Sequence, residues 1–234
     1  MNRKYFAAAA AILAVAFAVL WVAYGLNYGA RQTFSLAEAH ARIPEKTVYL
    51  TFDDGPSDRI TPKILDVLDS ENVKATFFIV GRQAERRGYL IRREAESGHT
   101  VAVHSYTHEY KDIYSSPRAL LADIDRCNDV IEKYTGRRAA VYRFPGGSYG
   151  LNAKLGAAVR AHGMKYVDWN ASLCDAEPGM SGAEKLFKNA VSSSAGKDNI
   201  VLLSHDSTSK TSTPEATRRI IQYYKQNGYS FGTF

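Results

Sequence analysis

The chain has 234 residues, of which 45% are hydrophobic, and its formal net charge at pH 7 is +6. A chain of this length can bury one good core, so we expect a single folded domain. The positive charge is not gathered in a basic run or interleaved with an aromatic ladder, which argues against a nucleic-acid-binding protein. Nothing in the sequence implies a protein partner.

The N-terminal segment carries an uncharged run, Tyr5–Tyr24, directly after Arg3 and Lys4. About twenty apolar residues are enough to cross a bilayer as a helix. The run is longer than the ~7–15-residue core of a cleaved signal peptide, and no small-x-small cleavage site clearly follows it. The basic residues in front of it predict a cytoplasmic N-terminus and an exported remainder.

This segment sets the expected organisation of the chain. We expect a single-pass protein of the cell membrane whose folded domain lies outside the cytoplasm, with secretion after cleavage as the alternative. The expected parts are a transmembrane signal anchor at residues 1–30, a short stem at residues 31–45 and a folded domain at residues 46–234.

Seven strand-like apolar runs alternate with single amphipathic helices in this domain. The predicted strands lie near residues 46–53, 73–80, 100–104, 139–144, 164–170, 199–204 and 229–233. Strands that alternate with single helices imply an α/β fold with a parallel sheet and right-handed crossovers.

Two of the predicted helices have readable ends. Ser116 and Pro117 supply an N-cap and a first-turn proline to one helix, and Gly136 ends it. Ser181 and Glu184 have the spacing of a capping box, which predicts the start of another helix at that point.

Two adjacent carboxylates stand at the tip of the first predicted strand. Asp53 and Asp54 follow the apolar run Val48–Leu50, and Gly55-Pro56 turns the chain directly after them. Like charges this close need a cation or hydrogen-bond donors before both can be ionised in a dry pocket. An acidic turn is the simpler interpretation, and the motifs further along the chain favour a functional site instead.

His104 and His108 stand at positions i and i+4, directly after the apolar run Thr100–Val103. This spacing stacks both imidazoles on one face of a helical turn, where they can offer two nitrogen ligands to one metal. One carboxylate and two histidines make a three-ligand site with room for water, which suits a catalytic zinc or a similar divalent ion.

Two further motifs also follow predicted strands. Arg143 precedes the glycine-rich turn Pro145-Gly146-Gly147, whose backbone N–H groups are free to face a ligand, and His205 ends the apolar run Val201–Ser204. The polar motif residues therefore stand at the carboxyl ends of four different strands. Barrel enzymes assemble their active sites on that face.

In this order, the motifs resemble those of the polysaccharide deacetylase family, the carbohydrate esterases that share the NodB homology domain, over roughly residues 46–232. The resemblance implies a distorted, incomplete (β/α)7 barrel. It also implies a hydrolase that removes N-acetyl groups from a cell-envelope polysaccharide, with N-acetylglucosamine of peptidoglycan as the expected substrate. The alternatives are deacetylation of chitooligosaccharide or another glycan, hydrolysis of acetyl esters on a polymer such as xylan, and an inactive wall-binding relative.

The resemblance assigns the metal ligands and the base. Asp54, His104 and His108 match the family's metal triad, which implies one divalent ion, Zn2+ or alternatively Co2+. Asp53 matches the general base that takes a proton from water, and Arg143 would hold it ionised and oriented.

The resemblance also assigns the acid and the substrate contacts. His205 matches the general acid that protonates the departing amine, and Leu203 would line the pocket for the acetate methyl. Oxyanion charge would fall in part on the backbone N–H that follows Pro145. Many family members carry Tyr directly after this proline, whereas Gly146 stands here and provides no side-chain wall.

The carboxylate that orients His205 has two candidates. Aligning Trp169-Asn170 with the opening of the family's fourth motif places Asp175 at the orienting position, with Ala176 where a second Trp is usual. Asp168 is the alternative, because Asp168-Trp169 is the Asp-Trp dipeptide that the family's fourth motif usually contains. We favour Asp175, since Asp168 lies inside a predicted strand and Asp175 lies in the loop beyond its tip.

Other conspicuous residues have simpler interpretations. Cys127 lies on the apolar stripe of its helix and is expected to fill the core; a disulfide with Cys174 is not expected. His99 follows a helix-to-strand turn, where a structural role is expected. Tyr106 and Tyr110 flank the histidine pair and could stack on a sugar ring, although packing is the simpler interpretation.

Overall fold

The computed structural model describes residues 46–234. The predicted anchor at residues 1–30 and the stem at residues 31–45 lie outside this range. Within the described range, no helix is both long enough and apolar enough to cross a membrane. Residues 46–234 belong to one compact unit.

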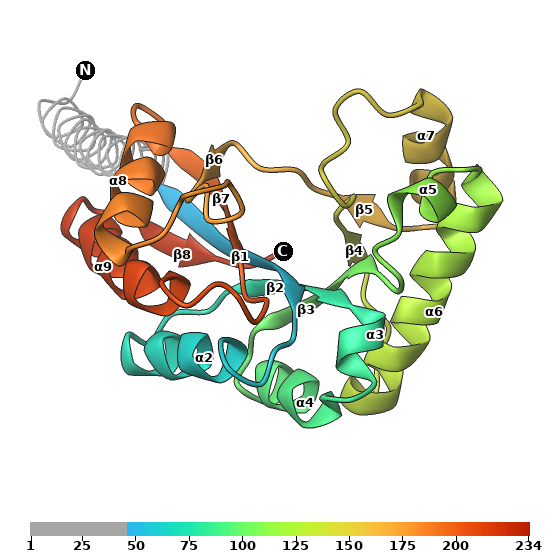
Figure 1. Ribbon diagram of the computed structural model, residues 1–234, viewed down its shortest axis with the longest axis horizontal. Helices are drawn as coiled ribbons and strands as arrows, with labels where there is room; N and C mark the ends of the chain where they lie inside the picture. Colours follow the sequence, from blue (N-terminus) through green and yellow to red (C-terminus); the bar gives the residue numbers. More distant parts are fainter. Residues whose placement is uncertain (1–45) are drawn as a thin grey trace, which may run out of the picture. The chain divides into compact units, whose positions relative to one another are not determined.

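The centre of this unit is a parallel sheet of eight strands, in the order β5-β4-β3-β2-β1-β7-β6, with β8 paired to β1 (Figure 1). The strands are β1 Thr47–Gly55, β2 Thr76–Val80, β3 Thr100–Ser105, β4 Val141–Tyr142, β5 Lys165–Tyr166, β6 Ala171–Ser172, β7 Asn199–His205 and β8 Ser230–Gly232. The sheet curls and stays open between β5 and β6. This arrangement confirms the predicted incomplete α/β barrel.

The strand predicted at residues 164–170 is only the short β5, and β6 begins directly after this range, on the opposite edge of the sheet. The N–H of Val167 donates to the carbonyl of Tyr142 beside β4, whereas the N–H of Asn170 donates to the carbonyl of Val201 in β7. The chain therefore exchanges hydrogen-bonding partners within three residues as it crosses the opening. The amino-acid pattern of this segment cannot reveal the exchange, because side-chain hydrophobicity does not record which neighbouring strand the backbone bonds.

Helices cover the outer face of the curled sheet (Figure 1). They are α2 Thr61–Ser70, α3 Gly81–Ala84, α4 Gly88–Glu96, α5 Tyr110–Ile113, α6 Pro117–Thr135, α7 Ala153–Ala161, α8 Ala183–Ser194 and α9 Thr213–Gln226. The ends predicted for α6 are confirmed. The Oγ of Ser116 accepts the N–H of Ala119 at 3.1 Å, and Gly136 ends the helix at φ +76°.

The predicted capping box at Ser181 is wrong. Helix α8 begins one residue later than the box requires, at Ala183, and its N-cap is Gly182 at φ +93° with no side-chain capping bond. This shift moves Glu184 out of the third helical position. The N–H of Gly182 instead donates to Oγ of Ser212 at 3.0 Å.

Successive side chains of β1 point alternately into the hydrophobic core and into the interior of the barrel. Val48, Leu50 and Phe52 are buried in the hydrophobic core under the helices, while Thr51 and Asp53 are buried polar residues on the opposite face. Cys127 is buried in the same core and its thiol donates to the carbonyl of Ile79, which confirms its packing role. Both Cys127 and Cys174 are free.

Candidate active site

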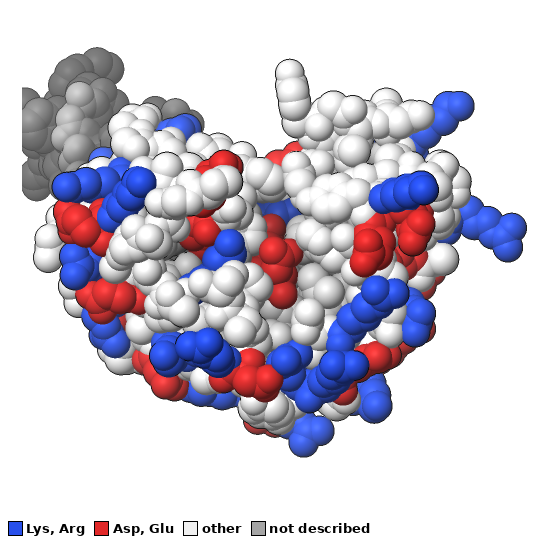
Figure 2. Space-filling view, viewed as in Figure 1, with Lys and Arg blue, Asp and Glu red and all other residues white. Residues whose placement is uncertain are grey.

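Polar side chains gather at the carboxyl end of the sheet. Asp53 and Asp54 lie near the end of β1, His104 lies in β3, Arg143 follows β4 directly, and His205 ends β7. The register of the parallel pair β1–β7 sets Asp53 opposite His205. The surface is hollowed between the part that carries α8 and α9 and the part that carries α5 to α7, and acidic side chains lie in this hollow (Figure 2).

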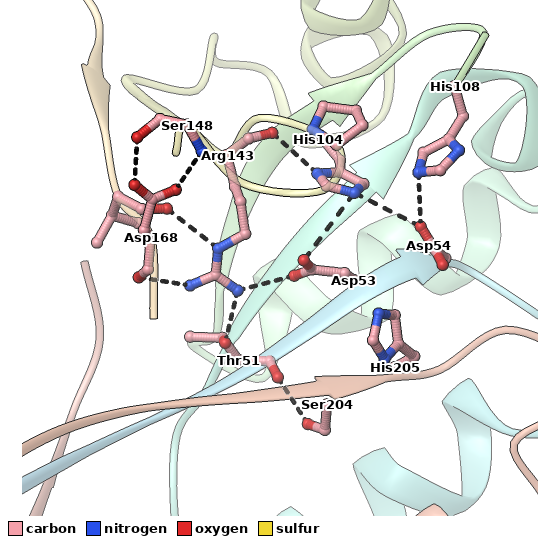
Figure 3. Close-up of polar contacts among 12 residues, drawn as sticks. Thr51, Asp53, Asp54, His104, His108, Arg143, Ser148, Asp168, Ser204 and His205 are labelled. Carbon is pink, nitrogen blue, oxygen red and sulfur yellow. Dashed lines mark hydrogen bonds and ion pairs between the residues drawn. The ribbon is translucent and has the colours of Figure 1, made fainter. Parts of the chain in front are cut away.

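Asp54, His104 and His108 form a compact ligand set (Figure 3). Oδ1 of Asp54 lies 3.1 Å from Nε2 of His108 and 3.5 Å from Nε2 of His104. The backbone carbonyl of Arg143 lies 2.9 Å from Nδ1 of His104. Because a carbonyl only accepts, Nδ1 of His104 carries a proton, and Nε2 is the nitrogen that faces Asp54.

These three residues fit a divalent metal. Ligands that bond a tetrahedral zinc at about 2.0–2.1 Å lie about 3.3 Å from one another, close to the two separations from Asp54. One carboxylate oxygen with two neutral imidazole nitrogens is also a donor set that suits zinc and similar ions. Burial raises the pKa of the Asp54 carboxyl, but hydrogen bonds with His104 and His108 and the charges of His104 and His205 outweigh burial and bring it well below its ordinary value. The carboxylate is therefore ionised at neutral pH.

The predicted helical placement of the histidine pair is wrong. His104 lies in β3, and His108 lies beyond the strand in a turn, at φ +61°. The N–H of His108 donates to Oγ of Ser105 at 2.8 Å, which ties the turn to the end of the strand. The two imidazoles thus converge through a strand end followed by a tight turn.

Asp123 of α6 organises this turn and is absent from the predicted site. Its carboxylate accepts the hydroxyls of Ser105 and Thr107, at 2.6 and 2.8 Å, and the N–H groups of Tyr106 and Thr107, at 2.7 and 3.0 Å. Four donors to one buried carboxylate fix the backbone between the two histidines. The available signal was an acidic residue inside the otherwise apolar stripe of the helix at residues 117–135.

Arg143 holds Asp53 from inside the barrel (Figure 3). The guanidinium is fully buried; its Nη1 donates to Oδ1 of Asp53 at 2.9 Å and to Oγ1 of Thr51 at 2.7 Å. Its other nitrogens donate to the carbonyls of Val167 and Asp168 at 3.1 and 3.3 Å. These bonds satisfy a charge that would otherwise be costly to bury. They also leave Oδ2 of Asp53 on the side of His104, 3.9 Å from its Nε2.

His205 is oriented by Asp175. Its Nδ1 lies 2.7 Å from Oδ1 of Asp175, whose Oδ2 accepts the backbone N–H of His205 and the hydroxyl of Thr213 at 2.9 and 2.8 Å. Burial lowers the pKa of His205, but the hydrogen bond to Asp175 and its charge outweigh burial and raise it above its ordinary value.

Asp168, the alternative partner, lies elsewhere. Its carboxylate accepts the N–H of Ser148 at 2.9 Å and also the hydroxyl of that residue. Asp168 therefore holds the loop that follows Gly147, while its carbonyl receives Arg143. The structure brings only Asp175 of the two candidates to His205.

The residues predicted to contact substrate lie beside these groups. Pro145 and Gly146 form the turn directly after Arg143, and the carbonyl of Pro145 accepts the hydroxyl of Tyr114 at 2.7 Å. Leu203 is buried in β7, two residues before His205 and paired with Thr51 of β1. Their contacts with substrate stay predictions.

Comparisons with known proteins identify similar sequences. The family model for polysaccharide deacetylases matches residues 40–167. A putative polysaccharide deacetylase of Bacillus subtilis is 33% identical over 193 residues, which is 80% of this chain and 67% of that protein. A peptidoglycan-N-acetylglucosamine deacetylase of Bacillus cereus is 30% identical over 189 residues, which is 81% of this chain and 86% of that protein.

Solved structures show the same fold. The catalytic domain of a peptidoglycan N-acetylglucosamine deacetylase from Eubacterium rectale is 40% identical, with a TM-score of 0.74, over 81% of this chain and 89% of that one. A Streptococcus mutans CE4 esterase is 31% identical, with a TM-score of 0.76, over 84% and 90% of the two chains. A family 4 acetyl xylan esterase from Clostridium thermocellum, solved with a cobalt ion, is 33% identical, with a TM-score of 0.71, over 80% and 88%.

Proposed function

Because this chain belongs to the polysaccharide deacetylase family, we propose that it is a metal-dependent hydrolase that removes N-acetyl groups from N-acetylglucosamine residues of peptidoglycan. One observation carries the proposal. The ligand set of Asp54, His104 and His108 lies beside a carboxylate held by Arg143 and a histidine held by Asp175. This combination provides a metal site, a base and an acid around one space.

The ligand set is expected to hold one divalent ion, Zn2+ or alternatively Co2+. Such an ion supplies Lewis-acid chemistry, which polarises an amide carbonyl and makes water a better nucleophile. The solved relative with a cobalt ion supports a divalent metal in this family.

Asp53 is the proposed general base, and the geometry selects its reactive atom. Oδ1 is occupied by the guanidinium of Arg143, whereas Oδ2 lies on the side of the ligand set. Oδ2 is therefore positioned to take a proton from the attacking water. Arg143 pairs with the carboxylate and fixes its rotamer, so that this atom stays directed into the site.

His205 is the proposed general acid. Asp175 occupies Nδ1, so Nε2 is the nitrogen that can deliver a proton to substrate. The raised pKa of the imidazole favours the protonated form, which is needed when the amine leaves as the C–N bond breaks. The backbone N–H of Gly146 is the proposed donor to the oxyanion, and Leu203 the proposed wall for the acetate methyl.

The choice of peptidoglycan rests on the names of the relatives. Two of them are peptidoglycan N-acetylglucosamine deacetylases. An acetyl ester of xylan is the second candidate, because one similar structure is an acetyl xylan esterase. An inactive wall-binding relative is disfavoured, since a protein freed from catalysis would be expected to lose a ligand, the base or the acid.

Acetate release tests this assignment. The full-length chain is incubated with peptidoglycan, chitooligosaccharide and acetylated xylan, and free acetate is measured. We expect release from the amino-sugar polymers, fastest from peptidoglycan. Release from xylan alone would make the protein an esterase. No release from any of the three would instead favour an inactive wall-binding relative.

The location of the protein is proposed from its sequence. The uncharged run Tyr5–Tyr24 behind Arg3 and Lys4 supports a membrane anchor with the enzyme outside the cytoplasm, where peptidoglycan lies. Fractionation of cells that express the full chain should recover it in the membrane, at its full mass. Recovery in the medium as a shortened chain would show that the segment is a cleaved signal peptide.

A further inference from the structure

Tyr110 lies at the border between the ligand set and the turn predicted to bind the oxyanion. Its ring packs against the imidazole of His108 edge to face, with the centroids 5.4 Å apart. On its other flank it packs against Tyr114, with the centroids 5.8 Å apart, and the hydroxyl of Tyr114 donates to the carbonyl of Pro145. The ring is thus held between a candidate metal ligand and the Pro145-Gly146 turn.

The same ring stands where a side chain of residue 146 would begin. A Cβ built on Gly146 would lie 3.1 Å from both Cε1 and Oη of Tyr110. Gly146 also has φ +74°, a conformation that residues with side chains rarely adopt. The turn therefore has no side chain of its own at this point, and Tyr110 supplies the neighbouring aromatic surface.

The two tyrosines near the histidine pair differ in how far they are exposed to solvent. Tyr106 is only 3% exposed and packs under the guanidinium of Arg126, 3.7 Å from its ring centroid, so it is a packing residue. Tyr110 is 48% exposed although it contacts His108 and adjoins Gly146. An aromatic ring that packs against two neighbouring rings and is still about half exposed is a preformed surface for an apolar ligand face.

From this placement we propose that Tyr110 is a substrate-positioning residue whose exposed ring packs against the pyranose ring that bears the scissile acetyl group. If the acetyl carbonyl is bound between the ligand set and the N–H of Gly146, the sugar that carries the acetyl group lies beside the ring of Tyr110. The axial C–H groups of a pyranose form an apolar face that matches an aromatic surface. The inference deepens the proposed function and rests on it.

Three tyrosine variants of the full-length chain test the role. Tyr110→Ala removes the ring, Tyr110→Phe keeps the ring and removes the hydroxyl, and Tyr89→Ala removes a tyrosine of α4 that is 61% exposed and has no ring contact with the histidine pair. Steady-state kinetics are measured on solubilised glycan strands of peptidoglycan, with chitooligosaccharide and acetylated xylan as further probes. Bound metal per chain is measured for each variant.

We expect Tyr110→Ala to raise KM about tenfold on the glycan that the wild type deacetylates, with kcat within about twofold and the metal content unchanged. Tyr110→Phe and Tyr89→Ala should both stay within about twofold of the wild type. An unchanged KM in Tyr110→Ala, a loss of metal in that variant, or equal damage in Tyr110→Phe would overturn the inference. A wild type that releases no acetate from any of the three glycans would instead overturn the proposed function.

Discussion

Asp175 bonds His205 through both of its carboxylate oxygens. Its Oδ1 lies 2.7 Å from Nδ1 of the imidazole, and its Oδ2 accepts the backbone N–H of the same residue at 2.9 Å. One carboxylate therefore fixes the ring and the backbone that carries it. Lys210 adds a bond from its Nζ to the carbonyl of Asp175 at 2.9 Å. This arrangement leaves Nε2 of His205 as the only ring nitrogen available to substrate.

Asp175→Asn should weaken the acid. The charge of Asp175 and its hydrogen bond raise the pKa of His205, so removal of the charge should lower that pKa and deprotonate the imidazole at a lower pH. The alkaline limb of the profile of kcat/KM against pH should therefore move to lower pH. At pH values above the shifted limb, kcat/KM should fall by about 10²-fold. Metal content should not change.

Asp168→Asn is the matched control for that variant. Asp168 accepts two bonds from Ser148 and none from His205, so this change should lower the melting temperature while the alkaline limb stays in place. A limb that moves in Asp168→Asn and stays in Asp175→Asn would reverse the assignment of the two carboxylates.

His104→Ala and Asp53→Asn should separate ligand from base. His104→Ala leaves two ligands, which hold a divalent ion poorly, so both bound metal and rate should fall. Asp53→Asn keeps the ligand set but removes the proton acceptor, so the rate should fall by about 10²–10⁴ while the metal stays. Metal analysis after dialysis, alongside acetate release, distinguishes the two. Equal loss of metal in both variants would make Asp53 a ligand.

The motif residues could be predicted because each follows an apolar run that becomes a strand of the parallel sheet. Strand ends of such a sheet share one edge, so the order of the motifs was enough to bring Asp53, His104 and His205 together. The partner of His205 was predicted correctly but from a wrong premise: Asp168 does not lie inside a strand, because β5 ends at Tyr166, and Asp168 lies beyond a strand end just as Asp175 does. The backbone conformations that carry these side chains were harder to predict.

The failures have a common physical cause, which is hydrogen bonding that residue spacing does not encode. A spacing of four suggested a helix for His104 and His108, but bonds from the loop to Asp123 and Ser105 set a turn with a left-handed residue instead. The bonds of Arg143 to Thr51 and of Asp175 to Thr213 join segments more than 30 residues apart. No short motif carries such information.

Gly55 and Asp206 offer a test of packing beneath the site. A Cβ on Gly55 would lie 2.1 Å from Oδ2 of Asp206, whose buried carboxylate accepts the hydroxyl of Thr61. Gly55→Ala should therefore lower the free energy of unfolding by about 1–3 kcal/mol. In an Asp206→Ala background, where the carboxylate is gone, the same change should cost less. Urea denaturation of the two single variants and the double variant measures this coupling, and an equal cost in both backgrounds would refute the contact.

His99 should make stability depend on pH. The residue is buried, as its predicted structural role requires, and its Nδ1 accepts the N–H of Ala75 at 3.2 Å. Burial and the nearby charge of Lys74 lower its pKa from 6.5 to about 4. Between these values the unfolded chain binds a proton that the native state does not, so stability falls as the pH falls through this window.

His99→Asn isolates this contribution, because the amide oxygen can accept the same N–H without titrating. Unfolding free energies from urea denaturation at pH 7 and pH 5 should show a smaller loss in the variant than in the wild type. Equal losses in the two proteins would show that His99 does not drive the acid sensitivity.

The most direct test of the metal-dependent deacetylase is acetate release from peptidoglycan by the full-length chain before chelation, after chelation, and after stoichiometric Zn2+ or Co2+ is added back. The ligand set of Asp54, His104 and His108 predicts that chelation abolishes release and that added metal restores it in the wild type, but not in His104→Ala. Full acetate release by chelated protein that contains no bound metal would contradict the account.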